Sequence, residues 1–327
     1  MRAVVARGPG GPDVLQVIDR SSPQPDGDHV LIRVDATSVS RADVEVRRGE
    51  APGVSFPRIP GCECAGTVSE DPAGRLRPGR RVVAFLGGLG RTYDGSYARF
   101  AAVRADRVFP VETELPASVL AALPVAYMTA AGALFDRLEL NRDHTLLVRG
   151  GSSAVGLAAI ALAAREGARV IATTRDPEKK RRLTAAGCDA VIVDSGQIVD
   201  AVGVLVPGGV DRVIDLVGPS CLKDSLAACA HGGALCAAGR LGGLAERVDR
   251  WALGGLLEHV RLTDFDVESQ PHEVTLSRLQ EIVDAVAAGE LAVGIETTIG
   301  LDDIVAAHRT IESGRTCGRI VMELVPT

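Results

Sequence analysis

Residues 144–156 read His-Thr-Leu-Leu-Val-Arg-Gly-Gly-Ser-Ser-Ala-Val-Gly, and a run of small apolar residues follows at 157–164. The apolar segment 145–148 predicts a short buried strand, the glycines predict a sharp turn, and the alanine-rich run predicts a helix. A second apolar segment at 169–173 predicts the next strand. Together these segments form a strand, turn, helix and strand unit, which is the building block of a parallel sheet.

The turn has the spacing Gly150-x-x-Ser153-x-x-Gly156. Glycines let a backbone bend sharply and approach a pyrophosphate, whose charge is received by free N–H groups at the start of the next helix. Ser153 stands where the usual fingerprint has its middle glycine, and we expect it to offer an N–H and a hydroxyl to phosphate. The pattern predicts a bound dinucleotide, and a plain turn of another α/β protein is the alternative. The expected contacts are Gly150, Ser152, Ser153, Ala154, Val155 and Gly156.

The end of the second strand indicates which dinucleotide binds. It carries no acid that could accept hydrogen bonds from an NAD ribose, and Thr174 and Arg175 stand there instead. Arg175, with Lys179 or Lys180, supplies positive charge for a 2′-phosphate. One charge-assisted bond contributes on the order of 1.5 to 3 kcal/mol, so the sequence favours NADPH. A solvated turn cation is the alternative for Arg175. Asp176, before a proline, is expected to cap the following helix.

The length of 327 residues exceeds what one core supports, so two domains are expected. Short strands broken by Pro and Gly predict a small β-barrel in residues 1–119. Alternating strands and helices predict a doubly wound parallel sheet in residues 120–266. The tail, 267–327, returns to a different texture. Within the tail, Ser277 and Gln280 are spaced as a capping box, and His308 is expected to be packed or half-exposed in a helix.

Composition limits the partners. The net charge of -6 argues against nucleic acid or an anionic membrane surface as the main partner. The longest apolar run, 154–164, is too short to span a bilayer. Seven scattered cysteines, an odd number, suit reduced thiols in a cytoplasmic protein. A strand expected at 259–267 could form a sheet edge that pairs across a homodimer.

With these segments placed, the chain resembles the medium-chain dehydrogenase/reductase superfamily, and within it the zinc-free quinone oxidoreductase group, along nearly its full length. The motifs that carry the resemblance are Pro-Gly-Cys-Glu-Cys-Ala-Gly-Thr-Val (60–68), Arg-Pro-Gly-Arg-Arg-Val (77–82), Gly-Ser-Tyr-Ala (95–98), the 150–156 turn, segment 209–218 and Gly-Arg-Ile-Val (318–321). The resemblance implies a GroES-like β-barrel catalytic domain, made of residues 1–119 and the tail 267–327, beside a Rossmann doubly wound domain of residues 120–266, with the active site in the cleft between them.

In zinc alcohol dehydrogenases that resemble this chain, the catalytic metal ligands fall at Ser40, Cys62 and Val125. A serine hydroxyl and a valine cannot replace the thiolates and imidazole that hold zinc, so no metal is expected. Segment 84–101 also lacks the cysteines of a structural zinc loop. Without a Lewis acid, oxidation of simple alcohols is disfavoured. Hydride transfer from NADPH to a quinone or an activated (α,β-unsaturated) carbonyl remains, and the partner would be a small-molecule electron acceptor.

The resemblance also implies roles for single residues. Thr129 would face the nicotinamide, Gly239 and Arg240 would lie near its carboxamide, and Thr174, Arg175 and Lys179 would hold the 2′-phosphate. Ser40, Asp43, Cys62 and Thr129 are the pocket candidates, with a structural role as the alternative for Asp43. Asp194 replaces a tyrosine that many quinone reductases carry near the adenosine.

Two other functions stay open. One is a catalytically silent NADPH-binding structural or redox-responsive protein. The other is an enoyl-reductase-like tailoring enzyme of a biosynthetic pathway, although residues 44–60 lack the tyrosine donor of that group.

Overall fold

The computed structural model describes residues 1–243 and 253–324. The chain divides into two compact units, one made of residues 1–125, 270–289 and 295–327, and the other of residues 126–269 and 290–294. The first boundary falls at residue 125 rather than 119 because helix α2 (Ala117–Ala121) packs against strands of the first unit. Residues 290–294, which the sequence assigns to the tail, belong to the second unit.

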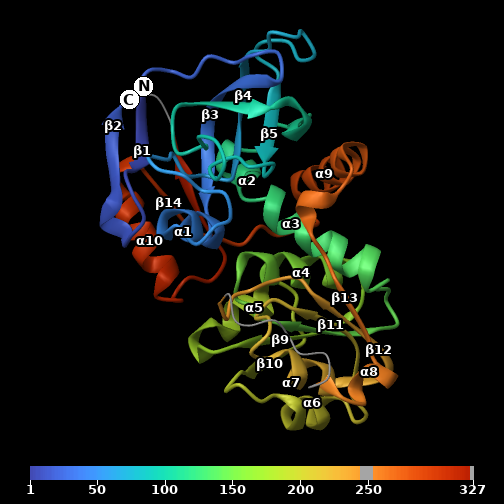
Figure 1. Cartoon of the computed structure of the whole chain (residues 1–327). Helices are drawn as coiled ribbons and strands as arrows, with labels where there is room; N and C mark the ends of the chain where they lie inside the picture. Colours follow the sequence, from blue (N-terminus) through green and yellow to red (C-terminus); the bar gives the residue numbers. More distant parts are fainter. Residues whose placement is uncertain (244–252, 325–327) are drawn as a thin grey trace. The chain divides into compact units, whose positions relative to one another are not determined.

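The first unit is built on antiparallel strands (Figure 1). Its main sheet has seven strands in the order β14-β15-β3-β4-β5-β7, with β6 paired to β3 and only β14 and β15 parallel to each other. A separate pair joins β1 and β2. The strands are β1 (Arg2–Ala6), β2 (Leu15–Asp19), β3 (His29–Val39), β4 (Glu63–Glu70), β5 (Arg81–Phe85), β6 (Phe100–Arg104), β7 (Val108–Pro110), β14 (Ile295–Ile299) and β15 (Arg319–Glu323). Besides α2, the helices are α1 (Arg41–Arg48), α9 (His272–Ala287) and α10 (Ile304–Glu312).

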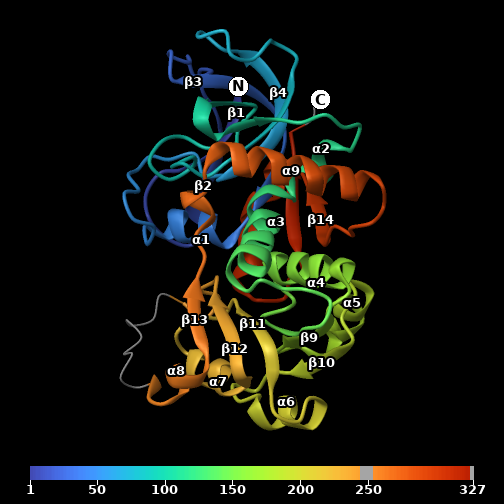
Figure 2. The same cartoon turned by 90° about the vertical axis from the view of Figure 1, so that its right-hand side faces the viewer.

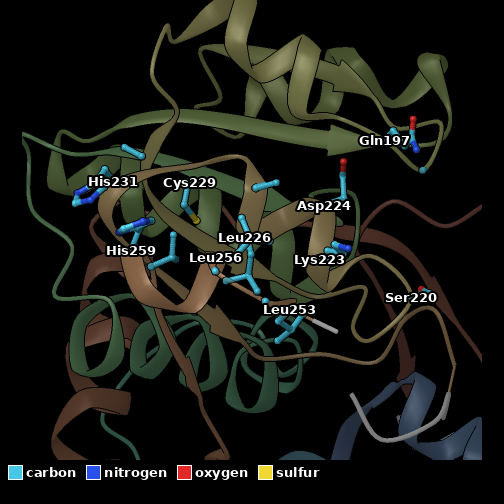
Figure 3. A pocket seen from close by; sticks show the side chains of 16 residues that line it. Gln197, Ser220, Lys223, Asp224, Leu226, Cys229, His231, Leu253, Leu256 and His259 are labelled. Atoms are coloured by element: carbon cyan, nitrogen blue, oxygen red, sulfur yellow. The ribbon is translucent and has the colours of Figure 1, made fainter. Parts of the chain in front are cut away.

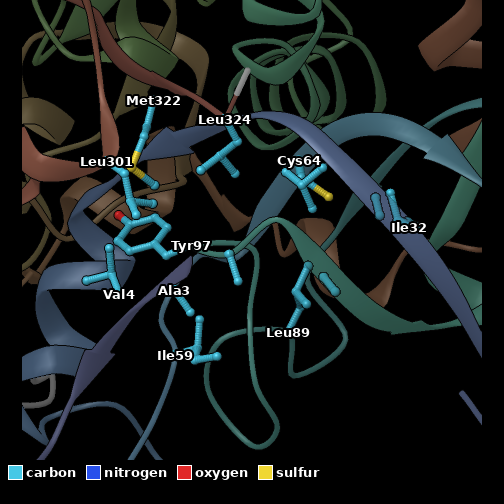
Figure 4. Close-up of a cluster of buried hydrophobic side chains, with 14 of the residues drawn as sticks. Ala3, Val4, Ile32, Ile59, Cys64, Leu89, Tyr97, Leu301, Met322 and Leu324 are labelled. Carbon is cyan, nitrogen blue, oxygen red and sulfur yellow. The ribbon is translucent and has the colours of Figure 1, made fainter. Parts of the chain in front are cut away.

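One apolar core explains why the tail folds with the first third of the chain. Side chains from the first strand, such as Val4, and from the tail, such as Leu301 and Met322, pack in one cluster with the ring of Tyr97 (Figure 4). Tyr97, Val4 and Met322 are fully buried. Since β15 also pairs with β3, both the core and the sheet of this unit require residues from the two ends of the chain.

The described part of the second unit forms a six-stranded sheet in the order β10-β9-β8-β11-β12-β13, and every neighbouring pair is parallel. Figure 2 shows β11, β12 and β13 side by side. The strands are β8 (Thr145–Arg149), β9 (Arg169–Thr174), β10 (Ala190–Val193), β11 (Val210–Asp215), β12 (Cys229–Ala237) and β13 (Arg261–Asp264). The helices are α3 (Pro124–Ala131), α4 (Ala154–Glu166), α5 (Lys180–Ala185), α6 (Val199–Leu205), α7 (Leu222–Ala227) and α8 (Leu256–His259).

This strand order confirms the predicted doubly wound sheet. The order reverses between β8 and β11, and ligands of open α/β sheets bind at the carboxyl ends of the strands near such a switch point. The turn at 150–156 follows β8 and therefore lies at that edge.

Two local predictions need correction. The capping box at Ser277 and Gln280 is wrong, because α9 already begins at His272 after Pro271 and both residues lie inside the helix. The last strand is shorter than the predicted 259–267, since α8 ends at His259 and β13 covers Arg261–Asp264.

Candidate functional site

The turn after β8 is shaped by two glycines. Gly150 has a φ of +87°, a conformation that side chains other than glycine rarely adopt. A Cβ added at Gly156 would lie 2.5 Å from the carbonyl oxygen of Gly150, so this position has no room for a side chain. The close approach brings the start of α4 against the end of β8. The first amides of α4, those of Ala154 and Val155, have no carbonyl partner within the helix, and they carry the positive end of its dipole.

Ser153 does not act as the sequence suggests. Its hydroxyl donates to the Gly150 carbonyl oxygen at 2.8 Å and accepts the Gly156 N–H at 3.0 Å. Its own N–H donates to the Gly150 carbonyl oxygen at 3.1 Å. The expectation that this N–H and hydroxyl face a phosphate is therefore wrong. Ser153 is the N-cap of α4, a position that serine favours because its oxygen satisfies a first-turn amide.

The end of β9 presents Arg175 to solvent. Thr173 and Thr174 are buried, whereas Arg175 is exposed and directly follows the strand. Asp176 accepts the Glu178 N–H at 3.0 Å, which confirms its predicted capping role. Lys179, the other predicted phosphate ligand, is buried, with only 8% of its surface exposed. Of these two cations, Arg175 is the more accessible.

Arg149, which the sequence analysis did not single out, forms buried ion pairs at the carboxyl edge of the sheet. Its guanidinium is fully buried and forms ion pairs with Asp194 at 3.0 Å and Asp224 at 2.7 Å. Burial raises the pKa of Asp194, but hydrogen bonds from Arg149 and from the Gly196 N–H outweigh it, and the pKa lies below its usual value. Asp194 is therefore held by protein groups. The available signal was a charged residue at the end of the apolar run 145–148.

The predicted carboxamide contacts lie at the end of β12. A Cβ at Gly239 would come within 2.5 Å of the Leu216 carbonyl oxygen, so glycine is needed where the segments after β11 and β12 meet. Arg240 follows it and is exposed. Both residues are at the same carboxyl edge as the turn at 150–156.

In the first unit the structure brings three of the four pocket candidates together. Asp43 is fully buried and accepts hydrogen bonds from the Ser40 N–H at 2.8 Å and the Ser40 hydroxyl at 2.6 Å. Its other oxygen accepts the N–H groups of Gly61 and Cys62, each at 3.1 Å. Burial raises the pKa of Asp43, and the hydrogen bonds from Ser40 oppose that change. With four donors on its carboxylate, Asp43 fixes the start of α1 to the segment before β4.

Cys62 is a buried thiol beside this carboxylate. Its sulfur lies 3.6 Å from the Ser40 hydroxyl oxygen. Burial, with the negative charges of Asp43 and Glu63, raises the pKa of the thiol well above its usual value.

The donor set does not fit a catalytic zinc. Val125 has no side-chain donor, and its backbone N–H donates to Glu63 at 2.9 Å. Of the three positions, only Cys62 carries a side chain that zinc sites commonly use, so Ser40, Cys62 and Val125 cannot complete a tetrahedral site. Across the described residues, no group of three or more His, Cys, Asp and Glu side chains is arranged to hold a metal ion.

Glu63 joins several elements of the first unit. It is fully buried, accepts a hydrogen bond from the Ser38 hydroxyl, and lies 3.1 Å from the Arg319 guanidinium. The fourth pocket candidate, Thr129, lies in α3, is 7% exposed and belongs to the other unit. Its place opposite the nicotinamide stays a prediction.

A large groove lies along α7, apart from the turn at 150–156. It encloses about 1040 Å³ and extends from Gln197 and Asp224 past Cys229 to the rings of His231 and His259, whose centroids lie 4.4 Å apart with their planes tilted by 31° (Figure 3). None of the residues of the turn lines it. In the parts of the chain that the structure describes, no helix is long and apolar enough to cross a membrane.

Comparisons with known proteins agree with these two folds. A family model described as alcohol dehydrogenase GroES-like domain matches residues 26–113, and one described as zinc-binding dehydrogenase matches residues 186–322. Quinone oxidoreductase of Mus musculus is 30% identical over 247 residues, which is 73% of either chain. A mycobacterial protein solved in complex with NADPH superposes with a TM-score of 0.89 at 30% identity, over 99% of both chains.

A phenolphthiocerol/phthiocerol polyketide synthase component of Mycobacterium tuberculosis is 30% identical over 97% of this chain, although the match covers only 14% of that much longer protein. The chain belongs to the medium-chain dehydrogenase/reductase superfamily of oxidoreductases. Its first unit has the GroES-like fold and its second the Rossmann fold.

Proposed function

We propose that this protein is an NADPH-dependent oxidoreductase that works without zinc and reduces a quinone or an α,β-unsaturated carbonyl. The observation that carries the proposal is the glycine-shaped turn at 150–156, with the first amides of α4 lacking carbonyl partners within the helix and Arg175 exposed at the end of the next strand. The likeness to a protein solved with NADPH supports the choice of cofactor.

Different residues of the second unit would bind different parts of the cofactor. The N–H groups at Ser152, Ala154 and Val155 would receive the pyrophosphate, because those of Ser153 and Gly156 are engaged within the turn. Arg175, with Thr174 and Lys179, would hold the 2′-phosphate. Gly239 and Arg240 would lie near the carboxamide, and Thr129 would face the nicotinamide. Bound NADPH supplies the hydride.

The electron acceptor must stabilise the incoming negative charge through its own structure. Ser40, Cys62 and Val125 cannot hold a zinc ion, so no Lewis acid would stabilise a developing alkoxide. Simple ketones or alcohols are therefore disfavoured substrates. A quinone or an enone delocalises the incoming charge over its own carbonyl, and the protein then mainly needs to position it. Ser40, Asp43, Cys62 and Thr129 remain the pocket candidates for this small molecule.

Two properties of the whole molecule complete the proposal. Among the described strands of its sheet, β13 is the outermost, so its edge would pair with the same strand of a second copy in a homodimer. All seven cysteines are free thiols, which supports the cytoplasmic location that we propose.

The test is NADPH oxidation, followed by absorbance, with a panel of quinones and a panel of enones in chelator-treated protein. Turnover with at least one acceptor that survives the chelator is expected. Absence of turnover with every acceptor, although NADPH binds, would favour a catalytically silent NADPH-binding protein instead.

A second candidate is an enoyl-reductase-like tailoring enzyme, which the match to a polyketide synthase over 97% of this chain favours. Enoyl thioesters in the same panel separate the two. Reduction of thioesters with little activity on quinones would select the tailoring enzyme.

A further inference from the structure

Arg149 is fully buried at the end of β8, and every nitrogen of its guanidinium donates. Nε and Nη2 form a bidentate pair with Asp194, at 3.0 and 3.2 Å. Nη1 donates to Asp224 at 2.7 Å, to the Ser225 hydroxyl at 3.0 Å and to the Cys221 carbonyl oxygen at 3.1 Å. A planar fork of five N–H groups suits this arrangement, which a lysine could not reproduce.

These contacts hold the loop 194–198, which follows β10. Arg149 Nη2 donates to the Gly196 carbonyl oxygen at 3.1 Å, and Asp194 accepts the Gly196 N–H at 2.8 Å. At the far end of the loop, Asp224 accepts the Ile198 N–H at 3.1 Å. The loop is thus fixed at both ends by carboxylates that Arg149 itself holds.

The same cluster reaches the turn at 150–156 through Thr173. The Thr173 hydroxyl donates to Asp194 at 3.3 Å and accepts the Gly150 N–H at 3.1 Å. Hydrogen bonds therefore run without a break from Gly150, through Thr173 and Asp194, to Arg149. Both the turn and the loop lie at the carboxyl edge of the sheet, where nucleotides bind in this fold class.

A gain in stability alone does not explain why this buried charged cluster is present. Burying charges is costly, and well-packed apolar side chains often stabilise a fold as well as a buried ion pair does. We propose that Arg149 is a positioning residue that locks the turn at 150–156 and the loop 194–198 together, so that the adenosine half of NADPH meets a preformed edge. This inference rests on the proposed function, since it concerns the site assigned there to NADPH.

Two variants test the role. Thr173→Val removes the hydroxyl that connects Gly150 with Asp194 and leaves the buried ion pairs intact. The triple change Arg149→Met, Asp194→Asn, Asp224→Asn removes the ion pairs of Arg149 without leaving a buried carboxylate unpaired. Arg165→Ala is the control, because Arg165 lies on the surface and pairs with the exposed Glu290.

Dissociation constants of NADPH and of 2′,5′-ADP, which lacks the nicotinamide half, are measured on folded protein, together with kcat at saturating NADPH. We expect both affinities to fall about tenfold in either variant, because a preformed edge lowers the ordering cost of binding, with kcat changed less than about twofold. Unchanged affinities in both variants would overturn the inference. Failure of the wild-type protein to bind NADPH would instead overturn the proposed function.

Should the triple variant fail to fold, Thr173→Val still decides the question. A loss of thermal stability with wild-type affinity for 2′,5′-ADP would assign Arg149 a structural role only and contradict the proposal.

Discussion

Two buried polar clusters in this chain differ in how completely they are satisfied. At the edge of the Rossmann sheet, every guanidinium nitrogen of Arg149 has a hydrogen-bond partner. In the GroES-like unit, Arg47, His308 and Arg319 are also buried, yet each keeps at least one side-chain nitrogen without a hydrogen-bond partner. The guanidinium of Arg149 is fully hydrogen-bonded by protein groups, whereas these three side chains of the first unit are not.

The largest effect is expected where the first unit is fully satisfied, at Asp43. Asp43→Ala would leave the N–H groups of Ser40, Gly61 and Cys62 buried without an acceptor, and should lower the free energy of unfolding by about 3 to 5 kcal/mol. Urea denaturation measures this. The matched control is Asp302→Ala, because Asp302 pairs with Arg2 at the surface and should cost at most about 1 kcal/mol. Equal losses in the two variants would remove the contrast on which the comparison rests.

The next effect concerns His308, whose neighbours are the Tyr97 hydroxyl at 3.4 Å and the charges of Arg47 and Glu312. Burial, aided by Arg47 and opposed by Glu312, lowers the pKa of His308 to about 3. Between the usual histidine pKa and that value, the unfolded chain binds a proton that the folded protein does not. Stability therefore falls as pH falls, by about 2 kcal/mol between pH 7.5 and pH 5 from this group.

The difference in unfolding free energy between the wild-type protein and His308→Gln isolates this contribution, since the variant cannot take up that proton. It should shift by about 2 kcal/mol in favour of the variant at pH 5. Tyr97→Phe is the control, because the pKa of Tyr97 lies well above its usual value and its hydroxyl stays protonated throughout. A shift of the same size in Tyr97→Phe would show that His308 is not the source.

A smaller change in stability is expected at the nucleotide edge. Gly156→Ala places a methyl group 2.5 Å from the Gly150 carbonyl oxygen and should cost about 1 to 2 kcal/mol, with weakened NADPH binding. Gly203→Ala in α6 is the control, since nothing lies within 4 Å of its added Cβ. Calorimetric titration with NADPH and thermal melting report both quantities. Unaltered NADPH affinity in folded Gly156→Ala protein would argue that the turn does not contact the cofactor.

The sequence predicted well what is encoded in contiguous residues. The unit 144–176 follows from local periodicity and glycine spacing, and the capping role of Asp176 follows from the proline after it. The barrel and parallel-sheet fold classes follow from the same kind of pattern. The grouping of Ser40 with Cys62 came from resemblance, and the structure places their side chains in contact.

Other features depend on competition or on distance along the chain. Ser153 has two possible uses for its hydroxyl, and capping α4 prevails over facing a phosphate. The capping box at Ser277 failed because a start signal at Pro271 precedes it. The ion pairs of Arg149 could not be predicted from the neighbouring sequence, since Asp194 and Asp224 lie 45 and 75 residues further along the chain.

The central claim is that Arg175 reads the 2′-phosphate of NADPH at the edge that Arg149 holds. The most direct measurement titrates NADPH and NADH into the wild-type protein and Arg175→Ala, with Arg165→Ala as a surface control. We predict that Arg175→Ala weakens NADPH binding about 10 to 100-fold and leaves NADH nearly unchanged. Equal losses for both cofactors, or none for either, would contradict the account.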